Sequence, residues 1–299
     1  MQEKYDTIYK GENMENKYIL NNISSFEPKH IFECGQCFRW KEENDNSYTG
    51  IFGKNVINVK KENNQIIFKG ISDGNIEEVC KNYFDLNRDY EMIKEKLSKV
   101  DNNLKTSIKY GNGIRILNQD LWETLISFII SANNNIPRIK GIIERISKKY
   151  GEKIEYNKKE YYTFPTPEEL SKASVSDLRN LGLGFRDKRI YETTKIVVEN
   201  PNLLEELINE KDIDVLRNKL LEFPGVGPKV ADCIMLFSLN KIEVFPIDVW
   251  VRRVMNDLYI KNENEEKVSK LQIEKLAREK YGNLAGIAQQ YLFYWRRGA

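Results

Sequence analysis

The spacing of apolar and polar residues divides the chain into two parts. From about Lys17 to Gly70, short runs of alternating apolar and polar residues are separated by polar turns, a pattern typical of antiparallel strands that bury one face. From Ile76 to Leu97, apolar residues instead recur with the period of a helix. This part of the sequence predicts a small antiparallel sheet with one face covered by helix, with strands at 38–40, 47–52, 55–60 and 65–69.

After the break at Gly111 and Gly113 the pattern is helical. Asp120 and Glu123 have the spacing of a capping box, and the apolar residues that follow predict a buried helix ending at 133–135. We therefore predict an α+β protein with a disordered N-terminus at 1–15, an antiparallel β domain at 16–115 and an all-α body at 116–299. Further helices are predicted at 137–149, 166–173, 176–181, 186–198, 213–222, 228–239, 248–259, 268–281 and 285–296.

The composition indicates a globular protein, because 31% of the residues are charged and 40% are hydrophobic. The net charge of +2 does not decide for or against nucleic acid, since a basic face can be offset by acidic helices elsewhere. No run of 18 apolar residues occurs, and the first residues lack an apolar signal segment. We therefore predict a cytoplasmic protein, nucleoid-associated in a prokaryote, with no membrane partner.

The sequence contains four cysteines and one histidine, and Cys34 and Cys37 have a C-x-x-C spacing. A zinc site needs a second pair of ligands, and the sequence offers none at a matching spacing. A four-cysteine iron-sulfur pattern near the C-terminus is also absent from the sequence. We predict reduced thiols, no metal and no cofactor.

The strongest local signal is the segment P-G-V-G-P from Pro224 to Pro228. Its two glycines permit positive φ and the close approach of another backbone, and a proline sets the first dihedral of a helix that starts near Pro228. The free N–H groups and the positive dipole end of that helix would face an anion. The hairpin therefore suits a phosphate of a nucleic-acid strand.

Two residues near this hairpin could carry chemistry. Lys229 lies in the first turn of the predicted helix, where the positive helix end favours the neutral amine, a nucleophile for Schiff-base formation. A lysine there could equally do no more than neutralise a phosphate. Asp248 precedes an apolar-periodic run and has the position of an N-cap, and its carboxylate could also stabilise positive charge on a sugar.

Five segments resemble, in the same order, the 8-oxoguanine DNA glycosylases of the helix-hairpin-helix base-excision superfamily. Residues 213–239 look like a helix-hairpin-helix, and G-V-G-P-K-V-A-D-C at 225–233 is similar to the family segment that holds its lysine. Monofunctional relatives keep the aspartate but lack this lysine. The other similar segments are C-G-Q-C-F-R-W at 34–40 and those at 133–138, 181–186 and 288–293, so the resemblance spans about 31–293.

This resemblance implies a bifunctional enzyme that flips 8-oxoguanine out of duplex DNA and excises it through a Schiff base on Lys229, with Asp248 in support. Cleavage on the 3′ side by β-elimination follows. The implied partner is duplex DNA with cytosine opposite the lesion, and we expect a monomer without an obligate protein partner. The implied contacts are base recognition by Gly35, Cys233, Gln289 and Phe293, gap filling and opposite-base reading by Asn133, Arg138, Phe185 and Arg186, and backbone binding by Gly225, Val226 and Gly227.

Three positions depart from the family pattern. Phe185 stands where many relatives have Tyr, Trp250 where His is frequent, and Cys37 where Ser is found. The opposite-base preference is the property that these departures put most in question.

Three other functions fit parts of the sequence. In a monofunctional alkyl-purine glycosylase the aspartate would act alone with water as nucleophile, and in a non-catalytic helix-hairpin-helix protein the hairpin would only grip DNA. A C-x-x-C redox protein is the third. Borohydride trapping separates the first two from a Schiff-base enzyme, because only an imine gives a covalent protein–DNA adduct.

Overall fold

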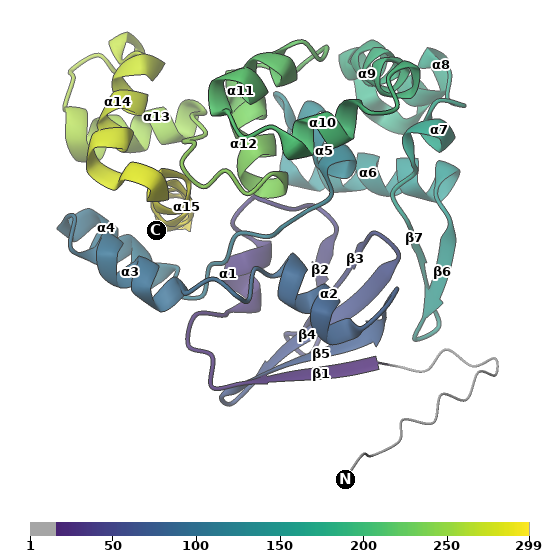
Figure 1. The fold of residues 1–299 in the computed structure, drawn as a ribbon, viewed down its shortest axis with the longest axis horizontal. Helices are drawn as coiled ribbons and strands as arrows, with labels where there is room; N and C mark the ends of the chain where they lie inside the picture. The colour runs from purple at the N-terminus through teal and green to yellow at the C-terminus, as the bar shows by residue number, and fades with distance from the viewer. Residues whose placement is uncertain (1–15, 299) are drawn as a thin grey trace.

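A five-stranded antiparallel sheet and a larger group of helices form the two layers of the molecule, with the sheet below the helices in Figure 1. The computed structural model describes residues 16–298, so the prediction of disorder at 1–15 lies outside the described residues. The predicted α+β class, with the sheet first in sequence and a helical body after it, is confirmed.

The sheet has the order β1-β5-β4-β3-β2, and each neighbouring pair is antiparallel. Its turns follow the predicted signals, since Gly53 and Asn63 both adopt positive φ, at 52° each. The edge strand β1 and the separate hairpin of β6 and β7 are additions to the prediction. The strands are β1 (Asn16–Asn21), β2 (Trp40–Glu42), β3 (Tyr48–Phe52), β4 (Asn55–Glu62), β5 (Gln65–Ile71), β6 (Lys153–Tyr156) and β7 (Lys159–Tyr162).

The first helices differ from the prediction of one continuous helix at 76–97. Asp85, with φ of 50°, breaks the chain between α2 and α3, and α4 was not predicted. These first helices are α1 (Pro28–Phe32), α2 (Ile76–Tyr83), α3 (Tyr90–Ser98) and α4 (Asn102–Tyr110).

The helical body contains every helix predicted after residue 120, and α10 in addition. Two predicted helices end early in π-turns, at η1 and η3. The elements are α5 (Leu121–Ser131), α6 (Ile136–Tyr150), α7 (Pro167–Leu170), α8 (Val175–Leu178), η1 (Arg179–Leu183), η2 (Gly184–Arg186), α9 (Asp187–Glu199), α10 (Leu203–Asn209), α11 (Ile213–Leu221), α12 (Pro228–Ser238), α13 (Val249–Met255), η3 (Asn256–Ile260), η4 (Glu265–Lys267), α14 (Lys270–Tyr281), η5 (Gly282–Leu284) and α15 (Ala285–Gly298).

Helix α5 is the central helix of the body, and nine of its 11 residues are buried, as the apolar run predicts. Asp120 caps it by accepting a hydrogen bond of 2.7 Å from the backbone N–H of Glu123. The predicted capping box is wrong in its second half. The Glu123 carboxylate lies 3.9 Å from Nε of Arg39 in the β domain instead of bonding back to the cap.

Aromatic packing forms the core of the β domain. The ring of Trp40 stacks on Phe32 at 4.0 Å between centroids, and its Nε1 donates to the Tyr83 hydroxyl at 3.0 Å. Burying an aromatic side chain of this kind contributes roughly 1.5–3 kcal/mol. The contacts fix the start of β2 directly after the 34–37 loop.

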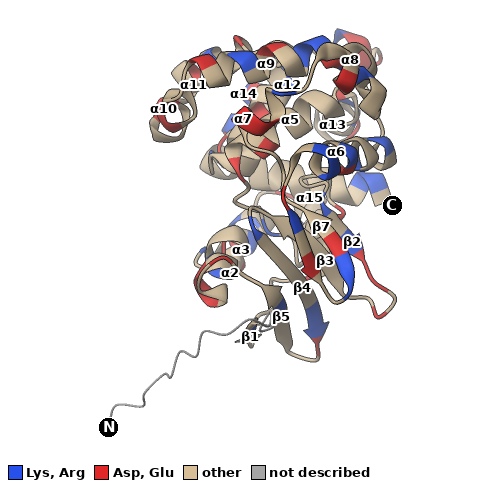
Figure 2. Cartoon of the chain, turned by 90° about the vertical axis from the view of Figure 1, so that its right-hand side faces the viewer, with Lys and Arg blue, Asp and Glu red and all other residues tan. Residues whose placement is uncertain are grey.

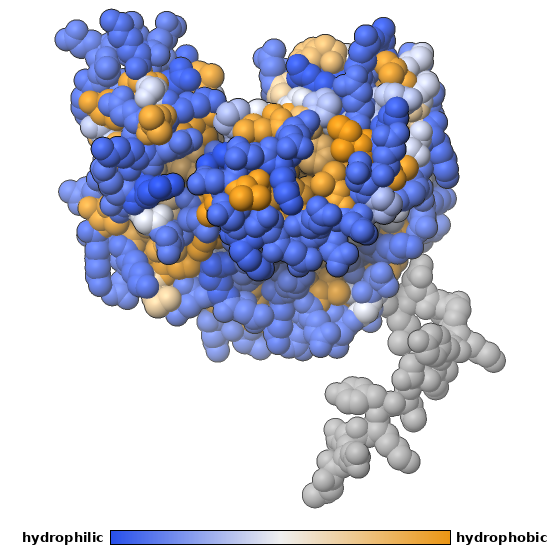
Figure 3. Space-filling view, turned by 45° about the horizontal axis from the view of Figure 1, so that its top comes forward, coloured by the Kyte–Doolittle hydropathy of each residue, from blue (hydrophilic) through white to orange (hydrophobic). Residues whose placement is uncertain are grey.

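The surface of the described part mixes charges of both signs. Lys and Arg are interspersed with Asp and Glu over the body, and the last turn of α15 is basic (Figure 2). Apolar side chains form scattered patches on an otherwise hydrophilic face (Figure 3). Among residues 16–298, no helix is long and apolar enough to cross a bilayer.

Candidate active site

The hairpin between α11 and α12 has the predicted geometry at its first glycine. Gly225 adopts φ of 90°, and a Cβ there would lie 2.7 Å from the Arg189 side chain, so both conformation and space require glycine. The Val226 side chain is buried and anchors the hairpin in the core. Helix α12 begins at Pro228, as predicted.

Gly227 does not use the positive φ that glycine permits. It is the N-cap of α12 with φ of −103° and ψ of 178°, an extended conformation open to any residue. A Cβ added to Gly227 would meet no atom within 4 Å. Its glycine therefore leaves open space outside the hairpin, which suits the close approach of a phosphate to the helix end.

Lys229 lies in the first turn of α12, half-buried, with Nζ 5.1 Å from the centroid of the Phe128 ring on α5. Cys233 follows one turn later on the same face of the helix and is 3% exposed. Burial raises the pKa of the Cys233 thiol to about 11, and hydrogen bonding and charge from Lys229 oppose that rise. The thiol is therefore neutral near pH 7 and borders the amine.

Asp248 completes this group from the start of α13. Its carboxylate accepts a 2.8 Å hydrogen bond from the backbone N–H of Val251, so the predicted N-cap is confirmed. It is also close enough to Cys233 to act electrostatically on that thiol. The structure thus brings Lys229 and Cys233 on α12 close to Asp248 at the start of α13.

Two exposed apolar side chains flank Asp248. Val249 is 60% exposed and Trp250 is 52% exposed, and the Trp250 ring lies 5.9 Å from the guanidinium carbon of Arg253. Large apolar side chains left open beside reactive groups are typical of a surface that another molecule covers.

Gly35 and Phe293 meet where the β domain touches α15. Gly35 has φ of 84°, and a Cβ there would lie 3.4 Å from Cε1 of Phe293. Within residues 16–298, no donor bonds to the Gly35 carbonyl oxygen. The structure therefore places a free acceptor beside an aromatic face, as base recognition by these two residues requires.

Gln36 fixes the position of that glycine, a role that the sequence analysis missed. Its amide nitrogen donates to the carbonyls of Ile31 at 2.9 Å and Arg115 at 2.8 Å, and its amide oxygen accepts from the N–H of Leu117 at 2.9 Å. The side chain is fully buried. Gln36 therefore fastens the 34–37 loop to the segment that connects the two domains.

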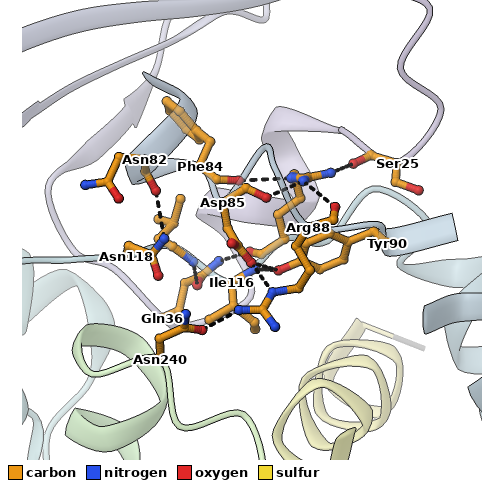
Figure 4. Close-up of polar contacts among 12 residues, drawn as sticks. Ser25, Gln36, Asn82, Phe84, Asp85, Arg88, Tyr90, Ile116, Asn118 and Asn240 are labelled. Carbon is orange, nitrogen blue, oxygen red and sulfur yellow. Dashed lines mark hydrogen bonds and ion pairs between the residues drawn. The ribbon is translucent and has the colours of Figure 1, made fainter. Parts of the chain in front are cut away.

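Arg115 extends this hydrogen-bonded group, which is drawn in Figure 4. Its guanidinium donates to the carbonyls of Phe84 and Ser25 at 2.9 and 3.0 Å, and it lies 4.2 Å from the centroid of the Tyr90 ring. Two further bonds reach the carbonyls of Asp85 and Arg88. A buried arginine that satisfies so many carbonyls holds several loops in one arrangement.

Gln119 ties the same loop to the catalytic helix. Its side chain donates to the Gln36 carbonyl at 2.8 Å, and its backbone N–H donates to the carbonyl of Phe237 on α12 at 3.0 Å. The loop that presents Gly35 and the helix that presents Lys229 thus share one hydrogen-bonded connection.

Gln289 lies on α15 one turn before Phe293 and is 4% exposed. Its amide oxygen accepts a 2.6 Å hydrogen bond from Gln290. The two predicted base-recognition residues of α15 thus share a face of the helix, four residues apart.

The four predicted gap-filling and opposite-base residues lie on adjoining loops. Asn133 follows α5 with φ of 50°, and Arg138 on α6 donates to the Gly182 carbonyl at 3.4 Å. Phe185 is 56% exposed, with its ring 4.2 Å from the guanidinium carbon of Arg186 and 5.2 Å from that of Arg189. An exposed ring fixed between two cations is suited to entering a base stack.

The Arg186 side chain points into the protein, although a residue that reads the opposite base would point outward. It is 2% exposed and donates to the carbonyls of Ala132, Asn133 and Leu183. In this structure Arg186 fixes the Asn133 loop, and its contact with an opposite base stays a prediction.

The C-x-x-C cysteines are buried thiols. Burial raises the pKa of Cys34 to about 12 and raises that of Cys37 further. Their sulfurs bond to the carbonyls of Ile31 and Phe32. Over residues 16–298 the structure has no His, Cys, Asp and Glu cluster arranged to hold a metal ion.

Comparison with known proteins assigns both parts of this architecture. Residues 18–125 match the family model of the 8-oxoguanine DNA glycosylase N-terminal domain, and residues 126–279 match that of the HhH-GPD superfamily base excision DNA repair proteins. The chain belongs to the HhH-GPD superfamily of base excision repair proteins. The two matches meet within α5.

Individual relatives agree with this assignment. A probable N-glycosylase/DNA lyase of Methanothermobacter thermautotrophicus is 37% identical over 70% of this chain and 71% of its own. The solved structure of MBOgg1 with a low-affinity DNA ligand is 45% identical, with a TM-score of 0.89 and 99% of both chains covered. That of Clostridium acetobutylicum 8-oxoguanine glycosylase/lyase, with double-stranded DNA containing cytosine opposite 8-oxoguanine, is 43% identical, with a TM-score of 0.89 over 95% of this chain and 98% of the other.

Proposed function

We propose that this protein is a bifunctional DNA glycosylase and AP lyase that excises 8-oxoguanine from duplex DNA, with cytosine as the opposite base. The observation that carries the proposal is the grouping of Lys229 and Cys233, on one face of α12, with Asp248 at the start of α13. Relatives that share both domains bear N-glycosylase/DNA lyase and 8-oxoguanine glycosylase/lyase names. The open start of α12 supplies N–H groups for a DNA phosphate.

The target nucleotide must leave the duplex before an amine can reach its sugar. Flipping costs a few kcal/mol, which is offset by filling the vacated stack and by stacking the base on the protein. Phe185 and Asn133 lie where they can fill the gap, and Phe293 offers the aromatic face. Arg138, on the neighbouring helix α6, would donate to the opposite base.

Recognition uses the proton that guanine lacks. 8-Oxoguanine carries a hydrogen on N7, whereas guanine presents a lone pair there. The Gly35 carbonyl accepts from no donor in the described part of the chain. A buried acceptor left facing a lone pair costs about 1–3 kcal/mol, so this contact alone separates the two bases by about ten- to a hundredfold.

The chemistry then proceeds through an imine. The Lys229 amine attacks C1′ while the bond from C1′ to N9 breaks, and the base leaves with the bonding electrons and takes up a proton. The Asp248 carboxylate stabilises the positive charge on the sugar. Loss of a proton from nitrogen and opening of the sugar give an imine between Nζ and C1′. Removal of the acidified C2′ proton expels the 3′ phosphate, and water hydrolyses the imine.

Borohydride trapping tests this function. The protein is mixed with duplexes carrying 8-oxoguanine opposite each of the four bases, quenched with borohydride, and the adduct is mapped by mass spectrometry. We expect one covalent adduct, on Lys229, formed fastest opposite cytosine. Base release without an adduct would instead support the alkyl-purine type of glycosylase, and binding without base release would support a non-catalytic DNA-binding protein.

A further inference from the structure

Arg297 lies beside Gly35 and Phe293, in the last turn of α15. It is one helical turn beyond Phe293, and the two side chains share a face of the helix. Its Nη1 is 3.6 Å from the place where a Cβ on Gly35 would be, and its guanidinium carbon is 5.9 Å from the Phe293 ring centroid. Gly35, Phe293 and Arg297 therefore form three sides of one small region.

The guanidinium of Arg297 has no ion-pair or hydrogen-bond partner within residues 16–298, and the side chain is exposed. Its neighbour Arg296 contrasts with it, because Arg296 donates to the Asp257 carboxylate at 3.1 Å. The buried Cys34 thiol close to Arg297 has a pKa raised to about 12, so it offers no negative charge. Arg297 is thus an unpaired cation beside an unpaired carbonyl acceptor.

These two groups present an acceptor next to a donor, the complement of one edge of an 8-oxopurine. That edge carries the N7–H donor beside the O8 acceptor, whereas guanine presents an N7 acceptor beside a C8–H group. When the Gly35 carbonyl accepts from N7–H, O8 on the adjacent C8 also comes close to Gly35. The Arg297 guanidinium lies there too. Arginine donors pair readily with oxygen acceptors on a purine edge.

We propose that Arg297 is a specificity-determining residue that donates a hydrogen bond to O8 of the flipped base. This inference rests on the proposed function and adds to it a second contact that guanine cannot make. Arg297 reads the oxygen, while Gly35 reads the hydrogen on N7. Hydrogen bonds to charged groups are stronger than neutral ones, so loss of this contact lowers excision of 8-oxoguanine by about tenfold or more.

The test compares the full-length protein with Arg297→Gln on three duplexes under single-turnover conditions. The duplexes carry 8-oxoguanine, 8-thioguanine or an abasic site opposite cytosine. 8-Thioguanine keeps the N7–H and replaces O8 by sulfur, a weaker acceptor, and the abasic site has no base to read. We expect Arg297→Gln to slow excision of 8-oxoguanine by about tenfold, to slow that of 8-thioguanine by about threefold or less, and to leave abasic-site cleavage nearly unchanged.

Arg296→Gln is the matched control, because it removes the same charge from the same helical turn and leaves Arg297 in place. We expect its ratio of 8-oxoguanine to abasic-site activity to equal that of the unsubstituted protein.

Two outcomes would overturn the proposal. Equal losses on all three duplexes, with a salt dependence of binding shallower by about one charge, would make Arg297 a phosphate contact. Unchanged rates on all three would leave only a cation that stabilises the C-terminal end of a helix. Failure of the unsubstituted protein to release 8-oxoguanine would refute the proposed function itself, which the abasic-site duplex distinguishes from a defect at Arg297.

Discussion

The catalytic group and the recognition loop of this protein are built in opposite ways. Lys229, Cys233 and Asp248 come from 20 consecutive residues and are placed by a hairpin, two helix starts and an N-cap. Gly35 is placed by its neighbour Gln36, whose partners Arg115, Leu117 and Gln119 lie about 80 residues away in the sequence. The reacting groups are therefore set by local structure, while the reading of the base depends on how two domains are fastened together.

The substitution with the largest expected effect removes the Lys229 amine. We expect Lys229→Gln to lower strand cleavage at 8-oxoguanine by about a thousandfold or more, because no other group supplies the imine, and to leave binding of lesion DNA intact. Single-turnover cleavage and fluorescence anisotropy measure the two effects. Lys219→Gln, which removes a charge from α11 in the same hairpin unit, serves as control. Cleavage by Lys229→Gln at the unsubstituted rate would place the nucleophile elsewhere.

Gln36→Glu should affect recognition far more than chemistry. The substitution keeps the shape but turns the donors to Ile31 and Arg115 into acceptors, which leaves buried carbonyls unpaired and shifts the Gly35 loop. We expect excision of 8-oxoguanine to fall by about 10- to 100-fold while abasic-site cleavage changes by less than about threefold.

The exposed Gln65→Glu is the matched control for this change. Parallel loss of both activities in Gln36→Glu, with a large fall in melting temperature, would assign Gln36 to general stability instead.

Gly35→Ala tests base recognition at the residue whose carbonyl oxygen accepts from N7–H. A side chain at φ of 84° is strained, and its Cβ would contact Phe293 and Arg297. We expect the ratio of 8-oxoguanine to guanine excision to drop by about tenfold. Gly53→Ala introduces a methyl group at another positive φ, in a turn remote from the site, and should leave the ratio unchanged. An unchanged ratio in Gly35→Ala would contradict readout by this carbonyl.

Phe185→Ala tests the wedge. The ring is 56% exposed, so its loss should leave the melting temperature nearly unchanged. Excision should slow by about fivefold, because a ring stacked on a base contributes about 1–3 kcal/mol. Leu271→Ala, at an apolar side chain that is 75% exposed on α14, is the control. Equal rates for Phe185→Ala and the unsubstituted protein would show that the ring does not enter the duplex.

The smallest expected effect concerns Glu123, which lies in the first turn of α5 and faces Arg39 of the β domain. Burial raises the pKa of Glu123 to about 7, although Arg39 opposes the rise. The folded protein therefore holds a proton that the unfolded chain releases near pH 4.5, so this group makes the fold less stable as pH rises from about 4.5 to about 7.

Glu123→Gln removes that dependence. The melting temperature of Glu123→Gln minus that of the unsubstituted protein should increase by about 3 °C from pH 5 to pH 8. Thermal unfolding scans at both pH values measure the difference, and a difference that does not vary with pH would refute the protonated state of Glu123.

Local signals in the sequence were enough for much of this structure. The start of α12 at Pro228, the cap at Asp248 and the buried α5 each follow from residues within one or two helical turns. Gly227 is the exception, because either sign of φ is open to glycine and only the packed hairpin decides between them. The edge strand β1 was missed because none of its residues is fully buried, and β6 and β7 because they have only four residues each.

The Gln36 network had no signal that a pattern could reveal. Gln36 pairs with residues 79 and 81 positions away, and Arg115 stands in the sequence like any solvated arginine between apolar neighbours. The position of Arg186 could not be predicted either. An arginine in a loop suggests an exposed side chain, but hydrogen bonds to three carbonyls keep this one buried. Contacts of this kind follow from the assembled fold and not from spacing.

Helix α5 fixes the spacing between two parts of the site. Gln119, which donates a hydrogen bond to the Gln36 carbonyl in the Gly35 loop, lies just before the first residue of α5. The Asn133 loop follows the last residue of α5. Its 11 residues span about 16 Å, so the helix holds the segment with Gln119 and the Asn133 loop about that far apart. One inserted residue would turn the far end by about 100° and move it by about 1.5 Å, so that a base held in the pocket and the hole that it left could no longer be engaged together.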